Sequence, residues 1–131
     1  MGRPDVMLLL DTSFLIEYER ELREQTLGAA RRLLQARGGE SVAISVVTLG
    51  EFAEGFETSK EAEAFISRFQ VVQLSRAIAY KAAAMQSALP QRLGENDAWI
   101  AATALVYNAE LAGRENAFER VPRLKYSPLK P

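Results

Sequence analysis

The sequence predicts an α/β protein in which helices cover both faces of a mostly parallel sheet of four to five strands. Short apolar runs without polar–apolar alternation recur along the chain, and such runs are typical of strands buried on both faces. Longer segments with helical spacing separate them, as expected where helices connect parallel strands. The 131 residues are 48% hydrophobic and 25% charged, which suits one globular domain over residues 1–131.

Five segments are expected to form strands: residues 6–10, 41–45, 71–74, 109–113 and 123–126. The first is a continuous apolar run that stops at Asp11. The fourth is predicted although Ala and Glu form strands poorly. The last is placed at an edge of the sheet because Pro122 and Pro128 bound it, and proline cannot join the ladder of a central strand.

Helices are expected over residues 11–18, 20–37, 45–56, 60–69 and 78–89, with a sixth after a loop at residues 90–94. Gly38 ends the second helix, since glycine often follows a helix C-terminus. Ser75 is expected to cap the fifth helix. Residues 114–118 are expected to form a loop or a short turn.

The sixth helix is apolar almost all the way round, which predicts that it lies buried in the middle of the domain. Asp97 falls in its first turn, where the positive end of the helix dipole favours a carboxylate. Such a carboxylate is either part of a site or only a complement to the dipole, with Asn96 as the cap.

The absence of Cys and His narrows the possible chemistry. Disulfides, Cys-based and His-based nucleophilic triads and typical zinc sites are all excluded. A metal would have to bind hard oxygen ligands, which suit Mg²⁺ or Mn²⁺. The formal net charge of −1 does not indicate coating by nucleic acid, although it allows a local basic patch. No apolar run approaches the roughly 18 residues of a membrane span, so we expect a cytoplasmic protein without a membrane partner.

Four acidic residues fall at related places in the predicted order of elements. Asp11 follows the first strand, Glu51 lies on the helix after the second, Asp97 opens the buried helix and Glu115 follows the fourth strand. In a parallel sheet these points can converge on the carboxyl edge, where ligands bind. Carboxylates gathered there repel one another, and a divalent cation relieves the repulsion. Structural roles remain open, with Asp11 or Thr12 as N-caps and Thr48-x-x-Glu51 as a capping box.

Three motifs in order resemble the PIN-domain ribonucleases, and among them the VapC-type toxins. They are Asp11-Thr12-Ser13 after a strand, residues 48–55 (Thr-Leu-Gly-Glu-Phe-Ala-Glu-Gly) and residues 96–104 (Asn-Asp-Ala-Trp-Ile-Ala-Ala-Thr-Ala). The resemblance covers nearly the whole chain. It implies a three-layer α/β/α PIN-like domain that cleaves structured RNA with Mg²⁺ or Mn²⁺. Asp11, Glu51 and Asp97 would be metal ligands, and Thr12 or Ser13 would order the site.

The fourth motif of that family departs from its usual pattern here. Ala112 stands where the family usually has Thr, and the acidic residue is offset. Glu115 is the best candidate for the fourth catalytic and metal-binding carboxylate, and Asn116 is the second. The departure leaves open a catalytically silent PIN-fold protein that only binds a protein partner.

The resemblance also implies a homodimer and a cognate antitoxin whose extended segment covers the active cleft. The helical pair over residues 14–34 is a candidate docking surface, although core packing is the alternative for each of its side chains. Arg92 and Arg114 flank acid-bearing loops and could orient an RNA phosphate, or could simply face solvent. A receiver or aspartyl-phosphatase domain is disfavoured, because Asp11-Thr12-Ser13 lacks the second acidic residue that both require.

Overall fold

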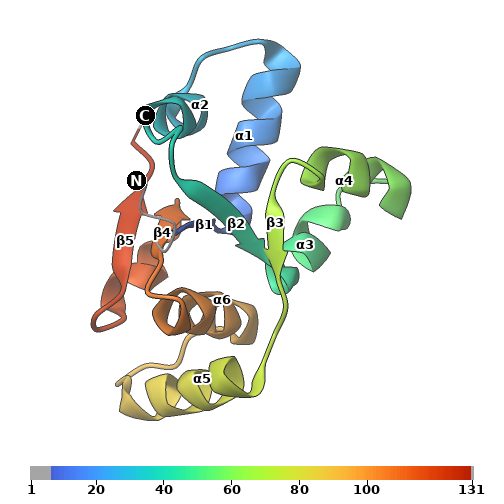
Figure 1. Ribbon diagram of the computed structural model, residues 1–131. Helices are drawn as coiled ribbons and strands as arrows, with labels where there is room; N and C mark the ends of the chain where they lie inside the picture. Colours follow the sequence, from blue (N-terminus) through green and yellow to red (C-terminus); the bar gives the residue numbers. More distant parts are fainter. Residues whose placement is uncertain (1–6, 131) are drawn as a thin grey trace.

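The computed structural model describes residues 7–130, which form one five-stranded parallel sheet (Figure 1). The strands are β1 (Met7–Leu10), β2 (Ser41–Ser45), β3 (Gln70–Val72), β4 (Glu110–Gly113) and β5 (Lys125–Pro128). Their order across the sheet is β3-β2-β1-β4-β5, and every neighbouring pair is parallel. The predicted sheet is therefore confirmed. Val6, which was predicted to begin the first strand, lies outside the described residues.

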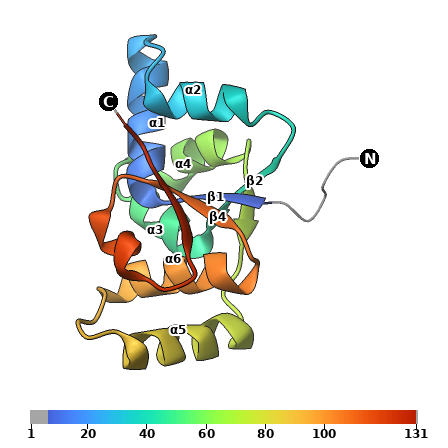
Figure 2. The same cartoon turned by 90° about the vertical axis from the view of Figure 1, so that its left-hand side faces the viewer.

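Helices cover the sheet on both sides. They are α1 (Thr12–Glu24), α2 (Ala29–Ala36), α3 (Val46–Ala53), α4 (Ser59–Ile66), α5 (Arg76–Ala88), α6 (Glu95–Val106) and the short 3₁₀ helix η1 (Asn116–Arg120). In both views α1 to α4 lie on one face, and α5 and α6 lie on the other (Figures 1 and 2). This arrangement confirms the predicted three-layer α/β/α fold. None of the helices described is long and apolar enough to cross a membrane.

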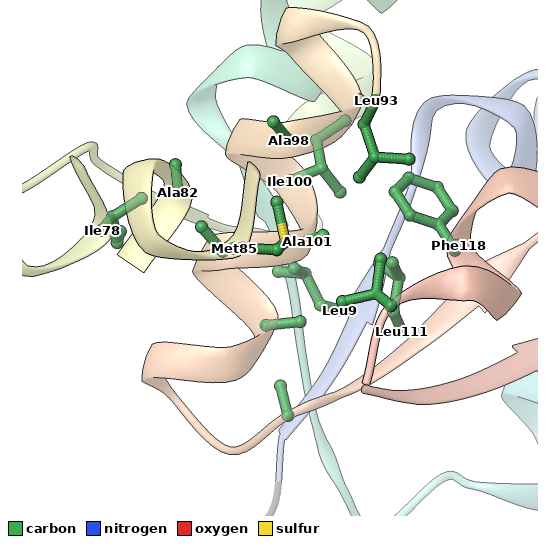
Figure 3. Packing of buried hydrophobic residues seen from close by; sticks show 14 of the residues in the cluster. Leu9, Ile78, Ala82, Met85, Leu93, Ala98, Ile100, Ala101, Leu111 and Phe118 are labelled. Carbon is green, nitrogen blue, oxygen red and sulfur yellow. The ribbon is translucent and has the colours of Figure 1, made fainter. Parts of the chain in front are cut away.

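The alternation of side chains along β1 divides the apolar interior into two clusters. Leu8 and Leu10 pack with buried residues of α1 to α4, whereas Leu9 packs with α5 and α6 on the opposite face. Figure 3 shows the second cluster, in which Leu9, Leu111 and the ring of Phe118 lie on the strand side of α6. The three leucines of β1, Leu8, Leu9 and Leu10, are fully buried, as predicted for a central parallel strand.

The division between the first two helices was predicted wrongly. The first helix was expected to end at residue 18 and the second to run over residues 20–37, but α1 continues to Glu24 and α2 begins only at Ala29. Gln25 terminates α1 in the left-handed conformation, with φ of 59°. The pattern of apolar residues did not reveal this boundary.

The boundary between α1 and α2 depends on Glu21, a fully buried carboxylate of α1. Its oxygens accept hydrogen bonds from the backbone N–H groups of Gly28 at 3.1 Å, Ala30 at 3.1 Å and Arg31 at 2.9 Å. These N–H groups at the start of α2 would otherwise have no partner. A Cβ atom on Gly28 would overlap the Glu21 carboxylate, so only glycine allows this close approach.

Other boundaries differ by a few residues. Residues 116–120 form η1, where a loop or short turn was predicted over residues 114–118. Strand β5 begins at Lys125, two residues after the predicted start of the edge strand, and it includes Pro128. Ser75 caps α5 as predicted, since its hydroxyl accepts from Ile78 N at 3.2 Å. Asn96 does not cap α6, because the N-cap is Gly94. The Asn96 side chain has another partner, described below.

Candidate active site

A cleft of about 460 Å³ opens at the carboxyl ends of β1 and β4, against the N-terminal end of α6. These two strands are neighbours in the sheet, and the connections from them run to opposite sides. Open α/β sheets bind ligands at the point where the strand order reverses in this way. The cleft is lined by Asp11, Thr12, Ser13, Ile16, Glu51, Glu54, Asn96, Asp97, Ile100, Glu115 and Phe118. All four carboxylates singled out in the sequence lie on this one surface.

Asp11 is the most buried of the four, with 1% of its surface exposed. Its Oδ1 atom accepts hydrogen bonds from Ser13 Oγ at 2.6 Å and from Phe14 N at 2.8 Å, so Asp11 is also the N-cap of α1. Its Oδ2 atom is buried and has no hydrogen-bond partner in the described part of the chain. A buried carboxylate oxygen without a partner is costly unless a cation binds it.

The acidic side chains influence one another's protonation. Burial raises the pKa of Asp11 to about 6, although the hydrogen bonds from Ser13 and Phe14 oppose the shift, and the negative charges of Glu115 and Asp97 add to it. Burial also raises the pKa of Asp97, and the nearby charges of Glu115 and Glu51 raise it further. The cleft is therefore a region of unrelieved negative charge.

Glu51 is held in the cleft by two polar side chains from other helices. Thr12 Oγ1 donates to Glu51 Oε1, and Asn96 Nδ2 donates to Glu51 Oε2 at 2.9 Å. The alternative capping-box interpretation of Thr48 and Glu51 is wrong, because Ser45 caps α3 by accepting from Val47 N at 3.0 Å.

Two hydroxyl groups hold the loop that follows β4. Ser13 Oγ accepts a hydrogen bond from Arg114 N at 2.7 Å, and the phenol oxygen of Tyr126 accepts one from Glu115 N at 2.7 Å. Burial, with the negative charge of Asp11 next in importance, raises the pKa of Tyr126 well above its usual range, so the phenol stays neutral. Tyr126 was not predicted to belong to the site, since no motif or spacing in the sequence connects it with an acidic residue.

Gly113 allows this loop to close over Asp11. A Cβ atom at position 113 would overlap the Asp11 carboxylate, and both of its oxygens would be affected. The preceding residue, Ala112, is fully buried, and its carbonyl oxygen accepts from Asp11 N at 3.0 Å. Residues 112 and 113 therefore serve as backbone support for Asp11, and Glu115 is the first residue of the segment whose side chain reaches the cleft.

Three of the predicted site residues do not line the cleft, namely Arg92, Arg114 and Asn116. Arg92 borders a smaller hollow of about 190 Å³ between α5 and α6, beside Trp99. Arg114 forms an ion pair with Glu17 on α1, with 3.3 Å between Nη1 and Oε1. Asn116 begins η1 and is absent from the cleft lining. Glu54 is exposed and also borders the cleft.

The donor set of the cleft fits a hard divalent cation. Its ligands would be carboxylate oxygens, and the unpartnered Asp11 Oδ2 is already desolvated. Among residues 7–130, however, no three acidic side chains stand close enough together to hold one ion without rotating. Both oxygens of Glu51 are engaged by Thr12 and Asn96, so this side chain would have to turn or share its bonds.

The fold and the cleft define a three-layer α/β/α domain with an acidic site at the carboxyl edge of its sheet. The family model of the PIN domain matches residues 8–124, and the chain therefore belongs to the PIN domain family. This result confirms the resemblance noted in the sequence. A search of curated proteins finds no significant match.

Among solved structures, the chain is similar in fold to chains of two VapBC complexes and one toxin–antitoxin complex. The chain is similar to a chain of VapBC2 from Rickettsia felis bound to a promoter DNA fragment, with a TM-score of 0.78, 20% identity and coverage of 95% of this chain and 99% of that one. It is also similar to a chain of DNA-bound VapBC from Salmonella typhimurium, with a TM-score of 0.77, 21% identity and coverage of 94% of this chain and 98% of that one. A third similar chain belongs to a toxin–antitoxin complex from Klebsiella pneumoniae, with a TM-score of 0.71, 28% identity and coverage of 89% of this chain and 94% of that one.

Proposed function

We propose that the protein is a Mg²⁺- or Mn²⁺-dependent endoribonuclease that acts as the toxin of a type II toxin–antitoxin pair in the cytoplasm. One observation carries the proposal: four carboxylates share one cleft at the switch point of the sheet, with a buried Asp11 oxygen lacking a partner. A bound divalent ion would supply an activated water and stabilise negative charge on the phosphodiester.

The chain's own residues would divide the work as follows. Asp11, Glu51, Asp97 and Glu115 would hold the ion, while Ser13 fixes Asp11 and Thr12 and Asn96 orient Glu51. Arg114 remains the better candidate for orienting a phosphate, because it adjoins Glu115 and its side chain is partly exposed. Arg92 lies on another surface and would contact only a more distant part of an RNA. Contacts of this kind weaken as salt is added.

A groove beside the cleft supports the proposal of an antitoxin. It has a volume of about 470 Å³ and is lined by Ile16, Glu19, Arg20, Arg23, Glu51, Phe52, Gly55 and Phe56. Ile16, which is 58% exposed, and Glu51 border both the groove and the cleft, so a bound segment could run from one into the other. The walls of the groove are α1 and α3 rather than the α1–α2 pair expected from the sequence. The relatives of known structure support an antitoxin partner, and the homodimer rests on family resemblance.

The cleavage reaction can be tested directly. Purified protein is incubated with total RNA and Mg²⁺ or Mn²⁺, with and without chelator, beside Asp11→Asn, Asp97→Asn and the control Glu63→Gln, whose exposed side chain lies on α4. We expect chelator-sensitive cleavage by the wild type and the control, and a loss of at least 100-fold in both Asp variants. Chelator-insensitive cleavage, or cleavage unchanged in both Asp variants, would contradict the mechanism.

The second candidate function is a catalytically silent protein-binding module. It is favoured by the replacement of the usual Thr by Ala112 and by the lack, within residues 7–130, of a preassembled group of three acidic ligands. Calorimetric titration with Mn²⁺ separates the two candidates. No heat of binding with the wild type, together with no cleavage of any RNA tested, would favour the silent module.

A further inference from the structure

The loop that carries Glu115 is fixed through its backbone rather than through its acidic side chain. Two consecutive N–H groups, those of Arg114 and Glu115, donate to the hydroxyls of Ser13 and Tyr126, each at 2.7 Å. Ser13 comes from the start of α1, and Tyr126 comes from the edge strand β5. The two hydroxyls therefore tie the loop to opposite sides of β4.

The ring of Tyr126 is held from behind by apolar packing. Its centroid lies 5.4 Å from that of Phe118, at an interplanar angle of 48°. Phe118 is itself almost fully buried against the α6 side of the core, as Figure 3 shows. A phenylalanine at position 126 could make the same ring contact, so the specific contribution of tyrosine is its hydroxyl, which accepts the bond from Glu115 N.

Holding this loop has an energetic purpose in an acidic cleft. The negative charge of Glu115 raises the pKa of both Asp11 and Asp97, because like charges in one cleft repel. A loop free to move would relieve the repulsion by swinging outward, and a cation would then have to draw it back. A loop fixed in place keeps the carboxylate where a cation can use it.

We infer that Tyr126 is a positioning residue that keeps Glu115 in the cleft for cation binding. This inference rests on the proposed function. Tyr126 does not line the cleft, and it acts only through the backbone of the Glu115 loop. Its loss should therefore lower cation affinity without unfolding the protein.

The test compares Tyr126→Phe with Tyr80→Phe, which removes the same hydroxyl from a residue 74% exposed on α5. The dissociation constant for Mn²⁺ is measured by calorimetry, and exchange of the Glu115 backbone amide is measured by NMR. We expect Tyr126→Phe to weaken Mn²⁺ binding about three- to ten-fold and to accelerate Glu115 exchange at least five-fold. Tyr80→Phe should change neither quantity.

A double-variant cycle distinguishes positioning from a general loss of stability. In a Glu115→Gln background the Tyr126→Phe change should alter Mn²⁺ affinity less than two-fold, because the carboxylate that it positions is gone. Equal losses in both backgrounds, or an unchanged affinity in Tyr126→Phe alone, overturn the inference while leaving the proposed function intact. A wild-type protein that binds no Mn²⁺ would overturn both, and the two failures are thereby distinguishable.

Discussion

Asp11 combines a structural and a chemical role in one side chain. Through Oδ1 it caps α1, while its Oδ2 points to a buried position without a partner in the described part of the chain. A cap needs only one oxygen, so burial of the second is a cost that capping does not require. This excess cost is what distinguishes Asp11 from an ordinary helix cap.

The raised pKa of Asp11 gives a prediction about stability and pH. The folded protein holds this proton up to about pH 6, whereas the unfolded chain releases it near 3.8. Between these values the folded state binds more protons, so the contribution of Asp11 to stability falls as pH rises, by roughly 3 kcal/mol in total between about pH 3 and pH 7. The fall is steepest between about pH 4 and pH 6 and is nearly complete at about pH 7.

Urea unfolding in the presence of chelator, at several pH values from 4 to 7.5, measures this effect. Relative to Asp11→Asn, the wild type should lose stability over that range, and the difference should level off at about pH 7. The variant serves as the reference because the other carboxylates titrate in both proteins. A wild-type curve parallel to that of Asp11→Asn would mean that Asp11 titrates normally.

At the scale of elements, α1 and α2 are joined by one buried carboxylate. Glu21 lies on α1 and accepts three backbone hydrogen bonds from the first turn of α2 and the residue before it. A charge placed there complements the positive end of the α2 dipole. The short helix α2 thus depends on α1 for its start, which local propensity alone does not provide.

Glu21→Ala should therefore destabilise the protein by about 2–4 kcal/mol, because it leaves three N–H groups and a small cavity buried. Glu24→Ala, on the same helix, removes only an ion pair with Arg20 whose side chains are each more than 40% exposed, and should cost about 0.5 kcal/mol or less. Denaturant unfolding of both variants measures the difference. Similar costs for the two changes would show that the buried bonds contribute little.

The whole molecule brings the cleft together through its sheet order. The chain passes from β1 outward to β3 and then crosses to β4 by way of α5 and α6, so that β1 and β4 become neighbours. Residues distant in sequence, such as Ser13 and Arg114, which are 101 positions apart, are thereby placed in contact. The same order of strands gathers negatively charged side chains at the carboxyl edge of the sheet.

Divalent cations should consequently stabilise the entire fold. At a Mn²⁺ concentration 100 times the dissociation constant, linkage predicts a gain of about 2.7 kcal/mol in the free energy of unfolding. Thermal unfolding with Mn²⁺, Mg²⁺ or chelator measures the gain, and Asp11→Asn together with Asp97→Asn should abolish most of it. Equal stabilisation of the wild type and this double variant would place the cation elsewhere.

The positions of the strands and most helices could be predicted because the patterns that define them are local. The run ending at Asp11, the Ser75 cap and the apolar helix after Asp97 each depend on residues within a few positions of one another. The predicted break between the first two helices was wrong because it depends on Glu21, a charged residue that hydropathy patterns assign to the surface. A cap was one of the two roles left open for the start of the sixth helix, and it was suggested by the position of Asn96, although the Asn96 side chain reaches Glu51 on another helix.

Local patterns in the sequence were enough to predict the order of strands and helices, with Asp11, Asp97 and Glu115 at the ends of elements and Glu51 on the third helix. Tertiary structure alone decided that these four line one cleft, that Arg92 faces another hollow, and that Tyr126 holds the Glu115 backbone. The physical reason is the range of the interactions. Backbone propensity and amphipathic spacing act over a few residues, whereas the contacts of a site arise from the packing of the whole chain, which joins residues without any fixed spacing between them.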